Sequence, residues 1–134
     1  MISRLDLLAS AEERLKDAET LYRGGRFDGT VYLSGYAIEL ALKARICKTL
    51  KWQSFPESSN EFRDYQSFKI HKLEILLRLS GIENKIIKSQ RYEAYWQVVA
   101  TWNPELRYKP ASSVTELEAA NMLKATKILL KALL

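Results

Sequence analysis

The chain has 134 residues, 47% hydrophobic and 28% charged, a composition typical of a single globular domain over residues 1–134. Five Gly and three Pro are too few for collagen-like, low-complexity or many-stranded β proteins. Residues 1–67 hold ten basic and ten acidic side chains, whereas residues 68–134 hold eleven and six, so the net charge of +5 lies in the second half. This asymmetry permits a polyanionic partner, but solvated helix faces would account for it equally well.

Cysteine and histidine are scarce, which limits the chemistry available to the chain. Cys47 is the only cysteine and His71 the only histidine, so an internal disulfide is excluded and a zinc site of thiolates and imidazoles would lack ligands. Cys47 lies in an apolar stretch, where a free thiol usually packs as a small hydrophobic group. The first residues do not build the apolar core of a signal peptide, and the sequence has no apolar run of about 18 residues. We therefore expect a soluble, cytoplasmic protein with no membrane contact, no metal and no cofactor.

The first predicted helix covers residues 3–23, where apolar residues recur at three- and four-residue steps. Ser3 with Asp6 resembles a capping pair, and Gly24–Gly25 is expected to end the helix. The second predicted helix covers residues 28–50 and is apolar on nearly all sides, which places it at the centre of a bundle.

Glu39 is the only charged residue between Gly29 and Leu42. A buried carboxylate needs a partner, and Lys43 follows one helical turn later on the same face. This pair is either structural or part of a polar site, and the sequence leaves both alternatives open. Small residues around it, including Gly35, would let neighbouring elements approach closely.

A long loop rich in aromatic residues is predicted over residues 52–68. Helices are expected over residues 69–80 and 83–102, ended by Gly81 and by Asn103–Pro104. Residues 103–110 are expected to form a corner, after which Ser113 and Glu116 would cap the last helix. Together these elements predict an all-α, up-and-down antiparallel four-to-five-helix bundle.

Two groups of residues are candidates for function. His71, expected in the first turn of the third helix, is the only side chain suited to acid–base work near its ordinary pKa, although it could simply bond a loop carbonyl or the helix start. Arg107 beside Tyr108 suits phosphate binding and base stacking, or equally the support of a corner. No phosphate-binding Gly-rich loop, no GxSxG and no HExxH occurs.

Three segments, in their order and spacing, resemble the HEPN domain family, and in particular its nucleotidyltransferase-associated type. They are LYRGGRFDGTVYLSGYAIELALKARI (Leu21 to Ile46), His71-Lys72-Leu73 and WNPELRY (Trp102 to Tyr108). The residues that match the family pattern at functional positions are Glu39, Lys43, His71, Arg107 and Tyr108.

The resemblance implies a helical bundle that forms a homodimer and is commonly encoded beside a nucleotidyltransferase in toxin–antitoxin or defence pairs. Many family members are metal-independent ribonucleases in which His follows Arg by about four to six residues, so that His acts as acid and base while Arg stabilises charge on the phosphate. That motif is missing here. Seven residues separate Arg63 from His71, and no His follows Arg91 or Arg107.

The missing motif favours a non-catalytic module that binds a nucleotide or RNA phosphate, or docks a partner protein. The residues expected to bind phosphate are Glu39, Lys43, His71, Arg107 and Tyr108. A divergent ribonuclease, in which His71 and Arg107 meet in space, is the first alternative. A structural scaffold without a nucleic-acid role is the second.

Overall fold

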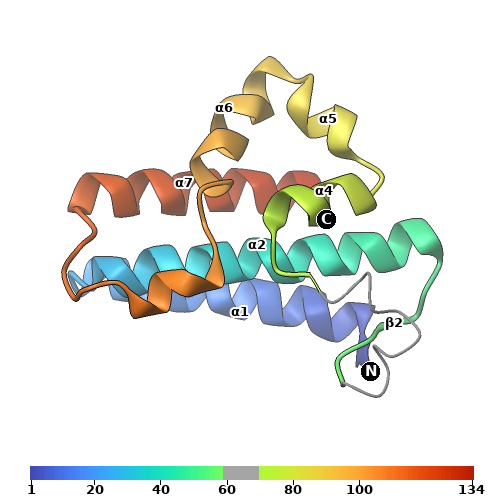
Figure 1. Ribbon diagram of the computed structural model, residues 1–134, viewed down its shortest axis with the longest axis horizontal. Coiled ribbons are helices and arrows are strands. Elements are labelled where there is room, and N and C mark those ends of the chain that lie inside the picture. The colour runs from blue at the N-terminus through green and yellow to red at the C-terminus, as the bar shows by residue number, and fades with distance from the viewer. Residues whose placement is uncertain (59–69) are drawn as a thin grey trace.

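The structure is a computed structural model that describes residues 1–58 and 70–134. The prediction of an all-α bundle is confirmed (Figure 1). The helices are α1 (Arg4–Arg23), α2 (Phe27–Leu50), α4 (Leu73–Leu79), α5 (Glu83–Ile87), α6 (Gln90–Val99), the 3-10 helix η2 (Pro104–Tyr108) and α7 (Glu116–Leu133). The strands β1 (Ile2–Ser3) and β2 (Ser54–Phe55) form a short antiparallel pair. The long helices α1, α2 and α7 lie side by side, and α4, α5, α6 and then the segment containing η2 bring the chain back to the end at which α2 began (Figure 1).

Helix α2 is the central element, as its apolar sequence predicts. It contacts α1, α7, α4, β2 and η2, and its side chains are buried from Thr30 to Cys47 with few interruptions. The helix can be surrounded in this way because Glu39 is its only charged residue between Gly29 and Leu42. Among the described residues, no helix is long and apolar enough to cross a membrane.

The predicted ends of α1 are confirmed. The Ser3 side chain accepts a hydrogen bond from the Asp6 backbone N–H, 3.0 Å away, and satisfies one of the free amides of the first turn. Gly24 is the C-cap of α1, and Gly25 adopts a positive φ of 73° that turns the chain into α2.

Three predicted helix boundaries are wrong. The helix expected over residues 83–102 is two helices, because the Ser89 side chain accepts a hydrogen bond from the Tyr92 N–H and caps a new helix there. The third helix begins at Leu73, so His71 precedes it instead of lying in its first turn. The last helix is capped by Thr115, whose hydroxyl accepts from the Glu118 N–H.

The cap of α7 lies two residues later than predicted because another contact holds the preceding loop. The Asp28 carboxylate, in the first turn of α2, accepts hydrogen bonds from the backbone N–H groups of Ser112 and Val114, at 2.6 and 2.9 Å. Ser113 lies between these two anchored amides, and Ser112 has a positive φ of 62°. The position of this loop could not be predicted from its own residues, since the side chain that holds it, Asp28, is on α2.

The first part of the predicted loop 52–68 contains β2, which the sequence did not indicate. Ile2 pairs with Phe55 and Ser3 with Ser54, so the strand pair joins the start of α1 to the segment after α2. Phe55 is only 1% exposed and belongs to the core. Residues 59–68 of this predicted loop, including Arg63, lie outside the described part of the chain.

Candidate functional site

Glu39 is the most deeply buried charged residue among those that the structure describes, with 3% of its surface exposed. It lies on α2, and both of its carboxylate oxygens have partners. Oε2 is 3.4 Å from the Lys43 ammonium, and Oε1 is 2.9 Å from Nδ1 of His71. The Glu39–Lys43 pair predicted from the helical spacing is therefore present, and His71 is a partner that the spacing could not predict.

Lys43 is held on its other side by an aromatic ring. Its ammonium lies 5.5 Å from the centre of the Phe55 ring, within the range of a cation–π interaction. Phe55 reaches this position because β2 pairs with β1. Lys43 thus neutralises Glu39 inside the fold, and its side chain is only 14% exposed.

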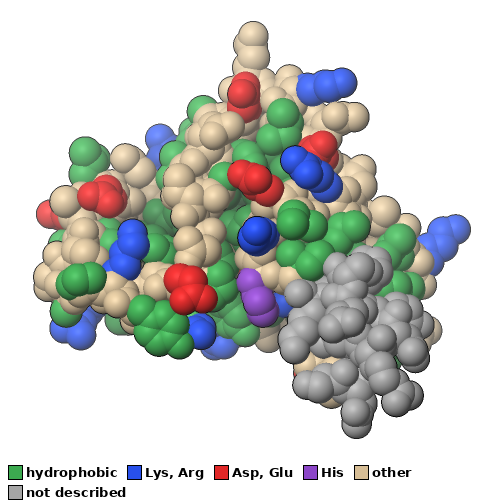
Figure 2. All heavy atoms as spheres, in the orientation of Figure 1, with side chains coloured by type: hydrophobic (Ala, Val, Ile, Leu, Met, Phe, Trp, Pro, Cys, Tyr) green, Lys and Arg blue, Asp and Glu red, His purple; other side chains and the backbone are tan. Residues whose placement is uncertain are grey.

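His71 reaches the surface while its Nδ1 is held from inside. Its side chain is 57% exposed, and Figure 2 shows the single histidine on one face with acidic and basic side chains close by. Because a carboxylate can only accept, the Nδ1 bound to Glu39 carries the proton, and the neutral ring then has its lone pair on Nε2. Nε2 makes no hydrogen bond to any residue in the described ranges. This arrangement fixes the ring and presents one nitrogen outward.

Arg107 lies on η2 and its guanidinium is exposed. Hydrogen bonds to the Tyr108 and Tyr32 side chains raise the pKa of Arg107, which is fully charged in any case. The guanidinium also lies 4.8 Å from the centre of the Tyr108 ring. Tyrosine side chains therefore hold the position of Arg107 on the surface.

A cleft of about 650 Å³ brings these segments together. Its walls come from α2, from the residues just before α4 and from η2. It is lined by Tyr32, Tyr36, Glu39, His71, Lys72, Trp102, Asn103, Pro104, Glu105 and Arg107. The structure thus places Glu39, His71 and Arg107 on one cleft, which we call the His71–Arg107 cleft.

Two of the predicted site residues lie apart from this cleft. Lys43 lines an adjoining cavity of about 240 Å³, together with Glu39 and His71. Tyr108 is 71% exposed and contacts the cleft only through Arg107. Its expected role in stacking a base within the cleft is therefore not supported by its position, although it does hold the guanidinium.

Tyr32, Tyr36 and Lys72 line the cleft and were missed in the sequence. Tyr32, Tyr36 and Glu39 follow one another at four- and three-residue steps, a spacing that places them on one face of α2. Burial, and next the charge of Glu39, raise the pKa of Tyr36, so its hydroxyl remains protonated and able to donate. The sequence spacing could have shown that Tyr32, Tyr36 and Glu39 share one helix face. It could not have shown that this face lines a cleft.

The electrostatics of the cleft favour an anion. Lys72 and Arg107 add two positive charges to its rim, and Glu39 is already compensated by Lys43. Glu105 is the other acid in the lining and lowers the net charge at the η2 end. In the described part of the chain, no three His, Cys, Asp or Glu side chains gather closely enough to hold a metal ion. The arrangement can bind a phosphate with Lys72 and Arg107 and exchange a proton at Nε2 of His71.

Comparisons with known proteins agree with the resemblance seen in the sequence. The HEPN domain family matches residues 5–56, which include almost all of α1 and the whole of α2 and β2. Glu39 and Lys43 lie within the match, whereas His71, Arg107 and Tyr108 lie beyond it. No curated protein and no solved structure matches the chain. The resemblance is thus confirmed over residues 5–56, the part of the chain that matches the HEPN domain family.

Proposed function

We propose that the chain is a HEPN-type binding module that holds a phosphate of a nucleotide or of RNA in the His71–Arg107 cleft. One observation carries the proposal: His71 and Lys72, just before α4, line the same cleft as Arg107, which comes from η2. A guanidinium and an ammonium at a rim suit phosphate oxygens, and the half-buried Tyr32 ring in the same lining suits a base or a ribose. The excess of basic residues after residue 67 favours the same class of partner.

Binding of a short fluorescein-labelled single-stranded RNA, followed by anisotropy, tests this proposal. We expect the affinity to fall steeply with salt, because each phosphate contact adds about −0.7 to the slope of log K against log salt. The variants Arg107→Gln and Lys72→Gln should each weaken binding by about tenfold and make that slope shallower.

Lys88→Gln is the matched control, because Lys88 is an exposed lysine outside the cleft. Its affinity and salt slope should change little. Equal losses in Lys88→Gln and Lys72→Gln would show that the RNA responds only to total charge and would overturn the proposed site. If the chain bound neither the labelled RNA nor, in a titration calorimeter, ATP, the proposed phosphate-binding function would be overturned.

A divergent, metal-independent ribonuclease is the second candidate, and the contact between Glu39 and His71 favours it. A carboxylate on Nδ1 fixes the ring, leaving Nε2 to take the proton of an RNA 2′-hydroxyl or to return one to the leaving oxygen. Arg107 would stabilise the charge that develops on the phosphate.

RNA cleavage in the presence of EDTA separates the two candidates. Cleavage that is lost in His71→Ala and reduced in Glu39→Gln, with RNA binding retained, would support the ribonuclease. RNA that stays bound but intact after long incubation would support the non-catalytic module.

The family resemblance also motivates two predictions about assembly. We infer a homodimer and docking to a nucleotidyltransferase partner, as one half of a toxin–antitoxin or defence pair. Sedimentation equilibrium of the purified chain tests the first prediction, and copurification with the product of a neighbouring nucleotidyltransferase gene tests the second. A monomer at all accessible concentrations would contradict the homodimer.

A further inference from the structure

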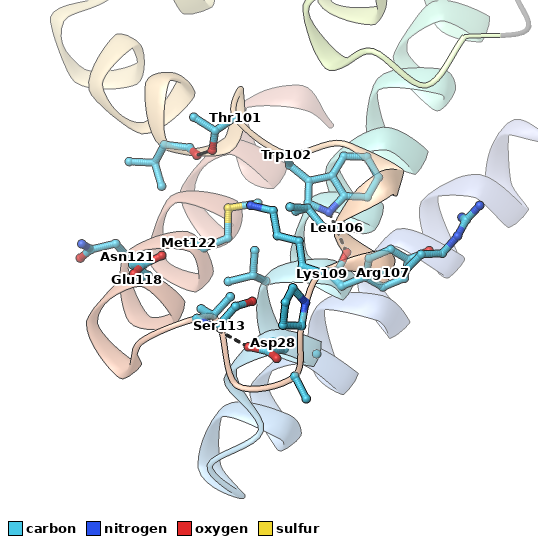
Figure 3. Close-up of a pocket in the computed structure, with 17 residues that line it drawn as sticks. Asp28, Thr101, Trp102, Leu106, Arg107, Lys109, Ser113, Glu118, Asn121 and Met122 are labelled. Carbon is cyan, nitrogen blue, oxygen red and sulfur yellow. Dashed lines mark hydrogen bonds between the residues drawn. The ribbon is translucent and has the colours of Figure 1, made fainter.

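A second cavity, of about 660 Å³, lies between α2, the end of α6, the loop after η2 and the start of α7 (Figure 3). It is separate from the His71–Arg107 cleft, and Tyr32, Trp102 and Arg107 line both. Its size is within the range of pockets that hold small organic molecules. The proposed function makes no use of this cavity.

The inner part of the cavity is apolar. Trp102 and Met122, which are 4% and 3% exposed, contribute to its wall together with Val31, Val98 and Leu106. Polar side chains from Thr101, Ser113 and Asn121 line the rest. An apolar interior with a few polar groups is the usual composition of a site for an amphipathic small molecule.

The charged residues of the cavity differ in whether they have partners. Asp28 accepts from two backbone N–H groups, and Glu118 accepts from the Thr115 hydroxyl at 3.1 Å. Lys109 makes no ion pair or hydrogen bond through its ammonium within the described ranges, and Figure 3 shows its side chain extending across the cavity toward Met122. Arg107 points away from the cavity (Figure 3). Lys109 is therefore the one cation in this lining that is free to pair with a ligand.

We propose that this cavity binds a small organic monocarboxylate with an apolar or aromatic body. The carboxylate pairs with the Lys109 ammonium, and the body lies against Trp102 and Met122. A single negative charge is required, because Asp28 and Glu118 in the same lining repel a phosphate dianion that Lys109 alone cannot neutralise. Both the charge of the head group and the apolar surface of the body thus follow from the lining.

Calorimetric titration with 4-phenylbutyrate and its uncharged amide, 4-phenylbutanamide, tests the proposal. The two probes share the apolar body and differ in the charge of the head group. We expect the carboxylate to bind about tenfold more tightly than the amide. Lys109→Gln should abolish that difference while the amide affinity stays unchanged.

Two further variants test the location. Thr101→Trp adds an indole at an exposed position in the lining and should block both probes without disturbing the core. Lys72→Gln alters the His71–Arg107 cleft and should leave both affinities as in the native chain. These outcomes are independent of RNA binding, so the monocarboxylate site and the proposed function can fail separately.

Several results would overturn the proposal. Equal affinity for the acid and the amide would mean that Lys109 makes no pair and only covers apolar surface with its stem. Weakened carboxylate binding in Lys72→Gln but not in Lys109→Gln would move the site to the other cleft. No heat with either probe would mean that the cavity is not a site for this class of ligand.

Discussion

The indole ring of Trp102 lies directly against the backbone of Gly35. A Cβ atom at position 35 would be 2.1 Å from the ring atoms Cδ1 and Cγ, and the indole N–H donates a hydrogen bond to the Tyr32 carbonyl at 3.1 Å. This contact attaches the segment after α6 to the middle of α2. It thereby places η2, with Arg107, on the same side of α2 as His71.

Gly35→Ala should destabilise the fold even though alanine favours helix by about 1 kcal/mol. The added methyl group has no space unless the buried indole moves, so we expect a net loss of about 1–3 kcal/mol in the free energy of unfolding. Urea denaturation followed by circular dichroism measures this loss. RNA binding should also weaken, because Arg107 follows Trp102 in the chain.

Gly29→Ala is the matched control on the same helix. Its Cβ would lie 2.9 Å from Cδ1 of Leu21, the end of a flexible side chain that can turn away. We expect this variant to be as stable as the native chain or slightly more stable. A larger loss in Gly29→Ala than in Gly35→Ala would contradict the role assigned to Trp102.

Glu39→Ala should cost about 3–5 kcal/mol, because the Lys43 ammonium then remains in a nearly buried position without its carboxylate. The double variant Glu39→Leu with Lys43→Met should recover much of that loss, since apolar side chains can replace a buried ion pair. Urea denaturation of both variants makes the comparison.

The exposed pair of Lys16 and Glu13 provides a control for Glu39→Ala. Lys16→Ala should change the free energy of unfolding by less than about 1 kcal/mol, because water screens this ion pair. A double variant no more stable than Glu39→Ala would show that the pair contributes more than mutual neutralisation.

Asp28→Ala should release the loop that precedes α7. The variant removes the acceptor for the backbone amides of Ser112 and Val114, and we expect a loss of about 1–3 kcal/mol. Hydrogen exchange should accelerate at these two amides before the rest of the chain responds. Asp17→Ala, which removes only an exposed contact to Arg14, should leave their exchange unchanged.

Cys47 should make stability depend on alkaline pH. Burial raises the pKa of the Cys47 thiol above its ordinary value of 9.0. Above about pH 9 the unfolded chain therefore loses a proton that the native chain keeps, so the free energy of unfolding falls as the pH rises. We expect the difference in urea midpoint between the native chain and Cys47→Ala to be smaller at about pH 10 than at about pH 8. The native chain loses the contribution of the thiol as the pH rises, whereas the variant never has it.

The same burial predicts that Cys47 is unreactive in the folded protein. Its side chain is fully buried, so Ellman's reagent should modify it only at urea concentrations that unfold the chain. Rapid modification in buffer alone, together with a pH dependence equal to that of Cys47→Ala, would contradict this account.

Features that depend on neighbours along one helix were predictable from the sequence. The Ser3 cap of α1 and the Glu39–Lys43 pair follow from residues within four positions of one another, and the buried position of α2 follows from its nearly uncharged stretch between Gly29 and Leu42. The shifted cap at Thr115 was missed because Ser112, Ser113 and Thr115 lie close together and each can serve as a cap, whereas the break before α6 depends on Ser89 alone.

The candidate site was only partly predictable. Five residues were named, and three of them, Glu39, His71 and Arg107, line one cleft. The sequence contains no distance between segments, so the partner of His71 and the contribution of Lys72 and Tyr32 could not be deduced from it.

By itself the sequence determined the helical class, the central place of α2 and the need of Glu39 for a partner, because the helical period and the cost of burying charge act locally. Tertiary structure alone decided which partners Glu39 received and which cleft Arg107 reached. The physical reason is packing: Trp102 fits only where Gly35 leaves space, and Asp28 can hold only the loop that this contact brings to α2.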